Sequence, residues 1–254
     1  NLPEIIQDLG MEYKIVDNIT LMSKNELPYP KDDCVIIYAS LNIVRKLNFY
    51  FGNYCNEENL KVSTYMAFLQ TKLSKYVNGD GIFVTFKQFK ENSNYYYNLF
   101  NNQSLFVKPN SGMKLFTGYV ISHNDLDKEL MYLNSTAISD DSLLLLSLSK
   151  IIENEARFVI IDGKVIDGSL YSLDGDIPNN IEIINDYLPK VQEFVKGSWY
   201  PDPIFTIDVG MVNTELQIIE INSFSGAGLY NMDIEKVIKE VSIFTEKSYE
   251  ENIV

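Results

Sequence analysis

Residues 205–230 read FTIDVGMVNTELQIIEINSFSGAGLY, and this stretch decides the fold that we predict for the chain. Apolar and β-branched residues alternate on both sides of the turn-forming segment Gly210–Thr214. The alternation predicts two strands joined as a hairpin, Ile204–Val209 and Glu215–Ile221. The rest of the chain is organised around this late hairpin.

Three oxygen-bearing side chains converge in the predicted hairpin. Asp208 lies near the turn on the first strand, and Glu220 and Asn222, two residues apart, leave the second strand on one face. Carboxylate and amide oxygens suit a hard cation such as Mg2+, which fills its remaining positions with water and nucleotide phosphate. A polar strand end with a capping Asn explains the same residues, and this stretch alone leaves both interpretations open.

Length, composition and charge limit the class of protein. With 254 residues the chain is long enough for one large core or two modest ones. Hydrophobic residues make up 46% and charged residues 22%, which is typical of a globular protein. The net charge of -14 argues against a surface that coats nucleic acid, although it is compatible with a local basic pocket. No apolar run approaches the roughly 20 residues needed to cross a bilayer, so we expect no contact with membranes.

The two cysteines, Cys34 and Cys55, lack the spacing of a zinc site or a disulfide framework. They favour reduced thiols and a cytoplasmic location. The first residue is Asn rather than Met, so we expect a start residue or leader to be missing from the sequence.

The first third of the chain predicts a small α/β domain over residues 1–98. Asp33–Ser40 is a compact apolar run of the kind found in buried parallel strands. Helices are predicted at Leu41–Leu47 and Ser63–Tyr76, and a further strand at Ile82–Phe86. A helix or loop at 91–102 then leads to the second domain, and no catalytic cluster is found before it.

A candidate phosphate-binding segment opens the second domain. The apolar strand that begins at Leu105 ends at Lys108, and a loop with Ser111, Gly112 and Lys114 follows. A strand-end lysine can bind phosphate as a point charge, and a small loop can bind it through backbone N–H groups. A solvated hairpin is the alternative. The GK[ST] ending of a Walker A loop is absent.

A second hairpin is predicted by the DGK turn within Glu153–Tyr171. Glu155 and Arg157 are two residues apart at the start of its first strand, so both side chains face the same side. In a nucleotide site Arg157 would bind a phosphoryl group and Glu155 a ribose or a charged partner. An exposed ion pair worth under about 1 kcal/mol is the alternative. An amphipathic helix, Ile181–Lys196, is predicted to follow.

Taken in order, four segments resemble an ATP-grasp ligase: FVKPNSGMKLFTG (106–118), SLSKIIENEARFVIIDGKVIDGSLY (147–171), FTIDVG (205–210) and IIEINSFSGAGLY (218–230). More narrowly, they resemble an ATP-grasp clade widespread in bacteria and phages. The resemblance implies a mixed fold, α/β plus α+β. A small N-terminal pre-ATP-grasp domain (1–98) would precede an ATP-grasp domain (99–254), whose subdomains, 99–145 and 146–254, clasp the nucleotide between antiparallel sheets.

The resemblance also implies roles for individual residues. Asp208, Glu220 and Asn222 match the ligands of two Mg2+ ions that bridge the ATP phosphates. Arg157 and Lys114 match catalytic positions that steady the phosphoryl group and cover it. The positions expected to contact the nucleotide are Lys108, Lys114, Leu148, Ser149, Lys150, Glu155 and Arg157. Ser223, Ser225, Gly226 and Gly228 follow the metal motif, where relatives approach the acyl phosphate or the acceptor. Two departures from the family pattern are Ala156, where an aromatic residue is usual, and a loop with only Gly112 and Gly118 as glycines.

The implied activity is ATP-dependent ligation of a carboxylate to an amine or a related nucleophile through an acyl phosphate, giving ADP and phosphate. The substrate would be a small molecule, an amino acid, or a peptide or protein terminus. Two rivals remain: a nucleotide-binding regulatory or degenerate ATP-grasp module, and a non-enzymatic protein-binding adaptor. The sequence leaves the substrate and the oligomeric state open.

Overall fold

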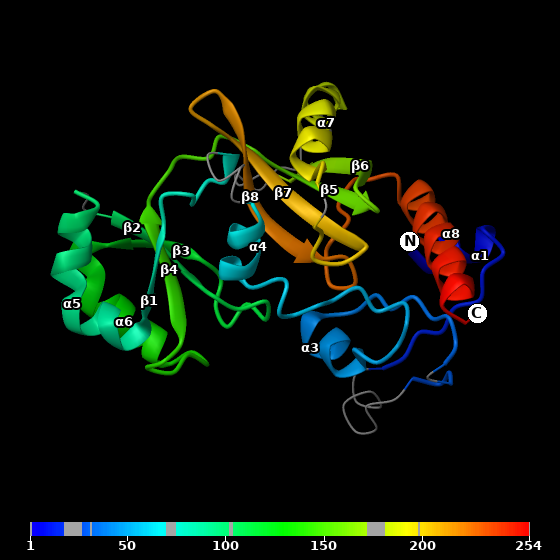
Figure 1. The fold of residues 1–254 in the computed structure, drawn as a ribbon, viewed down its shortest axis with the longest axis horizontal. Helices are drawn as coiled ribbons and strands as arrows, with labels where there is room; N and C mark the ends of the chain where they lie inside the picture. Colours follow the sequence, from blue (N-terminus) through cyan, green and yellow to red (C-terminus); the bar gives the residue numbers. More distant parts are fainter. Residues whose placement is uncertain are drawn as a thin grey trace. The chain divides into compact units, whose positions relative to one another are not determined.

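The structure is a computed structural model that describes residues 2–17, 27–30, 32–69, 75–101, 104–171, 181–197 and 199–253. Two compact units interleave along the chain. Unit 1 contains Asn1–Asn56, Asn154–Gly210 and Glu220–Val254, and unit 2 contains Glu57–Glu153 and Met211–Ile219. Each unit is built on a four-stranded antiparallel sheet (Figure 1). The predicted mixed fold with two antiparallel sheets is therefore confirmed.

The sheet of unit 2 has the order β1-β4-β2-β3. Its strands are β1 (Ile82–Thr85), β2 (Ser104–Pro109), β3 (Tyr119–Ser122) and β4 (Leu143–Leu148). The leucine run of β4 is the central strand, and Leu144, Leu145 and Leu146 are fully buried because both faces of this strand are covered. The helices α5 (Phe86–Leu99) and α6 (Leu126–Asn134) share one core with Leu144 and Leu146.

Helix α5 begins earlier than predicted. The strand expected at Ile82–Phe86 ends at Thr85, and the helix starts at once rather than at residue 91. Thr85 and Gln88 form a capping box: the Gln88 N–H donates to the Thr85 hydroxyl at 3.1 Å, and the Thr85 N–H donates to the Gln88 side chain at 2.8 Å. This T-x-x-Q signal was present in the sequence and marks the start of the helix.

The sheet of unit 1 has the order β6-β5-β7-β8. Its strands are β5 (Glu155–Ile161), β6 (Lys164–Tyr171), β7 (Ile204–Val212) and β8 (Glu215–Ser223). Two-residue turns with positive φ at both positions join the pairs, at Asp162-Gly163 and at Asn213-Thr214. Such turns match the twist of the strands they connect.

The second of these turns corrects the predicted hairpin. The turn was expected at Gly210–Thr214, whereas Gly210 lies within β7 and only Asn213 and Thr214 turn. Asn readily adopts the left-handed conformation that the turn requires, which is why the strands extend further than the alternation suggested. Asp208 therefore lies inside β7 and not beside the turn.

One face of this sheet changes from apolar to polar along the strands. Val159 and Ile161 share a core with Val237 and Val241 of α8 (Ile234–Ile253). Since side chains alternate along a strand, Arg157 and Glu155 lie on that same face, beyond the apolar part. The site described below is built at this polar end.

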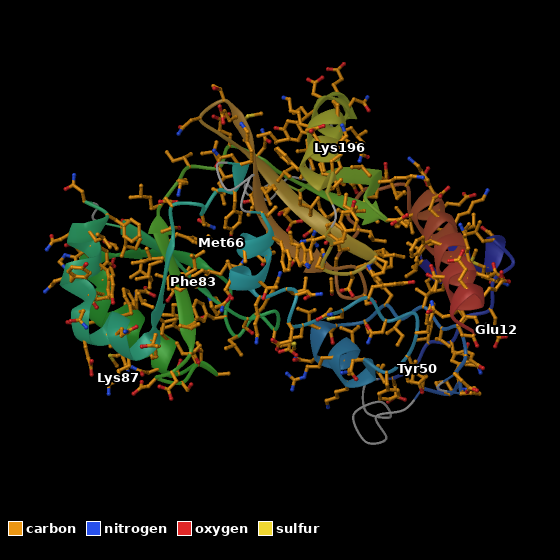
Figure 2. The ribbon with its side chains drawn as sticks, in the orientation of Figure 1. Glu12, Tyr50, Met66, Phe83, Lys87 and Lys196 are labelled. Atoms are coloured by element: carbon orange, nitrogen blue, oxygen red, sulfur yellow. The ribbon has the colours of Figure 1, made fainter. Side chains whose placement is uncertain are left out.

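Helix α7 (Ile181–Val195) packs against β5 and β6, as predicted, with Pro189 inside it. Its Gln192 fixes the β5–β6 turn, because its side chain accepts from the Val165 N–H at 3.0 Å and donates to the Gly163 carbonyl at 2.8 Å. Lys196, just past the helix end, points into solvent (Figure 2). No helix in the described ranges is both long and apolar enough to cross a membrane.

The N-terminal segment of unit 1 departs from its prediction. The run Asp33–Ser40 contains a single parallel bridge, Ile36 to Gly52, instead of a strand. Its hydrogen bonds go elsewhere in unit 1: the Ala39 N–H donates to the Ser225 carbonyl at 2.9 Å. A strand needs a neighbouring edge to pair with, and this segment instead packs on α8 and on the loop after β8.

Short helices make up the rest of the N-terminal third. They are α1 (Leu2–Asp8), which packs against α8, α3 (Leu41–Val44), η1 (Arg45–Leu47) and α4 (Val62–Phe68), and η3 (His123–Asp125) precedes α6. The helix predicted at Leu41–Leu47 is present as α3 and η1. The helix predicted at Ser63–Tyr76 is shorter, and residues 70–74 lie outside the described ranges. The predicted boundaries at residues 98 and 145 stay predictions, and the sheet of unit 2 starts before residue 98, at β1.

Gly168 of β6 tests the packing of the unit 1 sheet. A Cβ at this position would lie 2.3 Å from the ring of Phe158, its fully buried cross-strand partner. We expect Gly168→Ala to lower the free energy of unfolding by about 1–3 kcal/mol, because a buried ring must move. Gly197→Ala is the matched control, since a Cβ there meets nothing within 4 Å. Equal unfolding free energies for the two variants in urea titrations would contradict the packing described here.

Asp202, on the loop before β7, makes stability depend on pH. It accepts the Asn56 N–H at 2.8 Å, and burial raises its pKa from 3.8 to about 7 against the opposing effect of that hydrogen bond. The folded chain then retains a proton that the unfolded chain has lost, so stability falls as pH rises from about 4 to 7. We expect Asp202→Asn to flatten this decline and to be more stable than wild type at pH 8. Parallel stability curves for the two proteins would contradict the assignment.

Candidate functional site

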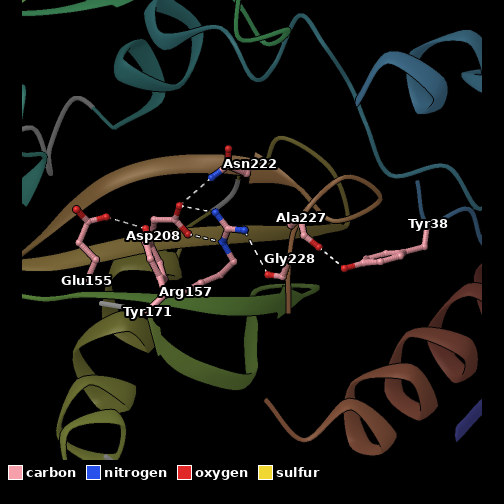
Figure 3. A network of polar contacts seen from close by, with 8 residues as sticks. All are labelled: Tyr38, Glu155, Arg157, Tyr171, Asp208, Asn222, Ala227 and Gly228. Carbon is pink, nitrogen blue, oxygen red and sulfur yellow. Dashed lines mark hydrogen bonds and ion pairs between the residues drawn. The ribbon is translucent and has the colours of Figure 1, made fainter. Parts of the chain in front are cut away.

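A buried ion pair lies at the centre of the polar end of the unit 1 sheet. Arg157 of β5 and Asp208 of β7 are direct cross-strand partners. The Arg157 Nε donates to Asp208 Oδ1 at 2.7 Å and its Nη2 donates to Oδ2 at 2.8 Å (Figure 3). Only 7% of Arg157 and 2% of Asp208 is exposed. The predicted alternative of an exposed ion pair with Glu155 is therefore wrong: the partner of Arg157 is Asp208.

The two-fold pairing keeps the arginine charged. Burial lowers the pKa of Arg157, but its hydrogen bonds and charge attraction to Asp208 outweigh burial and leave the pKa raised. Breaking a buried pair costs far more than breaking an exposed one, because it leaves the other charge without compensation. A fixed positive charge is therefore built into this end of the sheet.

The arginine also has donors left for a ligand. A guanidinium has five N–H groups. Two bind Asp208, and Nη1 donates to the Gly228 carbonyl at 3.3 Å. Three are thus engaged with described residues, which leaves at most two for an anion such as a phosphoryl group or a carboxylate.

Asn222 joins the pair from β8. Its side-chain N–H group donates to Asp208 Oδ2 at 3.0 Å, so its oxygen is directed away from Asp208 (Figure 3). Asp208 thereby accepts three hydrogen bonds, and a carboxylate offers about four acceptor positions. One position of Asp208 and the Asn222 oxygen remain for a cation.

Two further carboxylates surround this pair. The Tyr171 hydroxyl donates to Glu155 Oε2 at 2.8 Å. Burial is the main cause that raises the pKa of Glu155, and the negative charges of Asp208 and Glu220 raise it further. Glu220 is half-buried on β8, and its effect on Glu155 places its charge within the same electrostatic neighbourhood.

The oxygen donors of Asp208, Glu220 and Asn222 fit Mg2+. Within the described ranges, no group of three or more His, Cys, Asp or Glu residues is arranged to hold a metal ion. Mg2+ is usually bound by only one or two carboxylates together with substrate phosphates and water, so a partial set of protein ligands is what it needs. The three predicted metal ligands remain a proposal that this donor set supports.

Aromatic rings line the other side of the arginine. Tyr171 and Tyr230 stack with their ring centroids 4.8 Å apart and 14° between the planes. The Tyr38 hydroxyl donates to the Ala227 carbonyl, which joins residues 189 positions apart (Figure 3). None of these three tyrosines was predicted as a site residue. Tyr230 ends the predicted motif and was the only one with a local signal, because no spacing rule connects Tyr38 to this site.

The loop after β8 is held in place by the N-terminal segment. Ser225 is fully buried, and its hydroxyl accepts the Tyr54 N–H at 2.9 Å. The Ser223 hydroxyl accepts the Gly226 N–H at 3.1 Å, and a Cβ on Gly226 would lie 2.8 Å from a methyl group of Leu41. Ser223, Ser225 and Gly226 thus have structural roles here, whereas the Gly228 carbonyl contacts Arg157 directly.

The predicted phosphate-binding lysines belong to unit 2. Lys108 is half-buried on β2 opposite Leu145, and a Cβ on Gly118 would lie 3.1 Å from the Lys108 Cβ. Lys114 is exposed in the following loop with a positive φ of 49°. The loop is anchored by Asn110, which accepts the Ser63 N–H at 2.9 Å. Gly112 is packed so closely that a Cβ would lie 2.4 Å from the Glu57 carbonyl oxygen, so the loop is held at this end.

The predicted adenine-binding hinge follows β4. The Leu148 N–H donates to Asp80 Oδ2 at 3.1 Å, and Lys150 forms an ion pair with the same carboxylate. Lys150 also donates to the Leu148 carbonyl at 3.3 Å, and Ser149 between them is half-buried. Asp80, from the Asn-Gly-Asp-Gly turn before β1, is a hinge residue that was not predicted.

The structure therefore gathers the predicted residues in two groups, each within its own unit. Unit 1 brings together Glu155, Arg157, Asp208 and Asn222, with Glu220 in their electrostatic neighbourhood. Unit 2 holds Lys108, Lys114, Leu148, Ser149 and Lys150. The functional roles of both groups remain proposals.

Comparison with known families follows this geometry. Residues 84–240, more than half of the chain, match a family model described as an ATP-grasp domain, the second family of its clade. The chain belongs to this ATP-grasp family. The resemblance inferred from the four sequence motifs is confirmed. No curated protein matches the chain significantly.

Solved structures show the same fold at low sequence identity. A RimK domain ATP-grasp protein from Sphaerobacter thermophilus is 9% identical with a TM-score of 0.58, over 95% of this chain and 93% of that one. The D-alanine–D-alanine ligase from Bacillus anthracis is 14% identical with a TM-score of 0.51, over 98% and 92%. The ATP-grasp ligase PsnB complexed with its minimal precursor is 13% identical with a TM-score of 0.45, over 74% of this chain, which spans only 60% of PsnB.

Removal of Arg157 should expose how strongly the buried pair stabilises unit 1. We expect Arg157→Met to lower the free energy of unfolding by about 3–5 kcal/mol, because Asp208 would stay buried without its counter-charge. Lys196→Met is the control: its pair with Glu193 leaves both side chains about two-thirds exposed, at 66% and 67%, and should cost at most about 1 kcal/mol. Urea unfolding of both variants measures the difference, and equal losses would contradict a mutually dependent buried pair.

Proposed function

We propose that this ATP-grasp protein is a ligase that joins a carboxylate to an amine or a related nucleophile at the expense of ATP. In the first step a carboxylate oxygen attacks the γ-phosphorus of ATP, which forms an acyl phosphate and releases ADP. In the second step the nucleophile attacks the acyl carbon and releases phosphate. Family membership supports the use of ATP, and the charged network around Arg157 supports the ligation chemistry.

The observation that carries this proposal is the Arg157–Asp208–Asn222 network. Both steps concentrate negative charge on phosphoryl oxygens, so the protein must position the reactants and stabilise that charge. Arg157 is a charged donor held rigidly by two hydrogen bonds, and it retains up to two N–H groups for an anion. No nucleophilic side chain is needed for this chemistry. The overall charge of -14 presents no obstacle, because the positive charge is needed only locally.

Asp208, Glu220 and Asn222 would hold Mg2+ in this proposal, with two ions as the family resemblance implies. Bound there, the metal neutralises phosphate charge. The ATP-grasp ligase PsnB has a structure with Mg and ADP, and the ligase from Bacillus anthracis has one with ATP. We propose that the residues of unit 2, Lys108, Lys114 and the hinge Leu148–Lys150, bind the phosphates and the adenine of ATP.

The acid and the acceptor belong to the classes expected from the sequence. We propose an amino acid, a peptide or protein terminus, or another small molecule as substrate. Fold similarity alone does not choose among them, because acceptor pockets are built from loops that vary within a fold. We further propose a cytoplasmic site of action, where ATP is available.

Glu220→Gln tests the proposed chemistry. The variant keeps the size of the side chain but removes one negative metal ligand, so we expect ADP release to fall at least 100-fold while the fold is retained. The assay combines ATP, Mg2+ and a panel of amino acids and peptides, with hydroxylamine present to trap an acyl phosphate as a hydroxamate. Glu215→Gln is the matched control on the same strand, since Glu215 is exposed and pairs with Lys75.

The outcomes separate the rival functions. Hydroxamate and ADP formed in equal amounts support ligation through an acyl phosphate. Nucleotide binding without any acid-dependent ADP release would instead support a regulatory module. Absence of an Mg2+-dependent thermal shift with ATP would favour the non-enzymatic adaptor. Unchanged turnover in Glu220→Gln would show that the metal assignment is wrong.

A further inference from the structure

Two half-exposed tyrosine rings lie near Arg157. Tyr38 is 41% exposed and Tyr230 is 40% exposed, although both belong to the interior network of unit 1. Burial raises the pKa of Tyr38, the positive charge of Arg157 lowers it and Tyr230 raises it, so the three groups are electrostatic neighbours. Both rings therefore border the same positive charge and also reach solvent.

The stacking geometry leaves one face of Tyr230 open. Tyr171 covers one face, with centroids 4.8 Å apart and nearly parallel planes. The Arg157 guanidinium carbon lies 5.6 Å from the centroid of Tyr171 and 5.3 Å from that of Tyr230. Nearly equal distances place the guanidinium beside the stacked pair and not beyond either outer face. Neither Tyr171 nor Arg157 therefore covers the outer face of Tyr230.

The backbone holds this ring in a costly conformation. Tyr230 has a φ of +51°, which is uncommon for a residue with a large side chain. The neighbouring residues fix it: the Asn231 N–H donates to the Ser169 hydroxyl at 3.2 Å, and the Met232 N–H donates to the Leu229 carbonyl at 3.2 Å. Strained residues that the surroundings maintain are concentrated at functional sites.

The chemistry of this corner favours one class of ligand. The remaining N–H groups of Arg157 attract an anion, and the fixed positive charge disfavours an ammonium group beside it. An open aromatic face favours a flat apolar body at stacking distance. A carboxylic acid with an aromatic or similarly flat group satisfies both demands, because its carboxylate and its ring point to different parts of the corner.

We propose that Tyr38 and Tyr230 bind the side chain of the acid substrate, and that they select acids with an aromatic or similarly flat apolar group. This inference rests on the proposed ligase function and names the substrate class of that site. Tyr230 supplies the stacking face, and Tyr38, tethered to the Ala227 carbonyl, borders the site from the N-terminal segment.

Acid-dependent ADP release in the presence of hydroxylamine tests the inference, because hydroxylamine replaces the unidentified acceptor. The probes are phenylacetate and phenylalanine against acetate and alanine, with the full chain, ATP and Mg2+. We expect kcat/KM for the aromatic acids to exceed that for the small acids at least tenfold. Tyr230→Gly should abolish this preference without changing KM for ATP. Glycine suits the left-handed backbone, so this variant removes the ring and keeps the loop.

Two further variants make the result specific. Tyr230→Phe retains the ring and should keep the preference within threefold. Tyr13→Gly removes an exposed tyrosine of the same unit and should leave the preference unchanged. The same order of acids in wild type and Tyr230→Gly, or a preference of wild type for small acids, would overturn the inference and leave the ligase function standing. No hydroxamate and no ADP from any acid would overturn both.

Discussion

The buried pair of Arg157 and Asp208 is the constraint on which the rest of unit 1 depends. Two charges removed from water are tolerated only when each satisfies the other with good geometry and when neighbours satisfy what remains. Direct cross-strand placement on β5 and β7 gives the two-fold hydrogen bonding, Asn222 adds a third bond to the carboxylate, and the Gly228 carbonyl accepts from the arginine. The sheet register therefore serves stability and site geometry together, since a slip by one residue would turn one charge to the opposite face.

The same sheet face combines an apolar half and a polar half, and this division explains how a small unit can be stable and reactive. Val159 and Ile161 anchor α8, so the polar end beyond them is attached to a well-packed platform. The segment before Asn56 and the loop after β8 complete the platform from opposite ends of the chain, through Ser225 and Tyr54. A side chain held by such a platform loses little freedom when a ligand binds, which is the advantage of preorganised charge.

Several errors of the sequence-based prediction share one physical origin. The run Asp33–Ser40 has the composition of a strand, but composition does not provide an edge to pair with, and only the bridge to Gly52 forms. Arg157 and Glu155 were correctly placed on one face, yet the alternation could not reveal that Asp208 of another strand would take the arginine. By contrast, the turn at Asn213-Thr214 and the capping box at Thr85 were readable local signals, because they depend on neighbouring residues alone.

The sequence by itself determined the family, the two antiparallel sheets, the strands that carry Arg157, Asp208, Glu220 and Asn222, and the helix containing Pro189. Strand periodicity and turn chemistry act over a few residues, so they leave a pattern that the order of motifs makes specific. Only the tertiary structure decided that Arg157 is buried against Asp208, that Asp80 holds the Leu148 N–H, and that Tyr38 meets the loop after β8. These contacts join segments that are distant along the chain, and they depend on how whole elements pack, which no local pattern encodes.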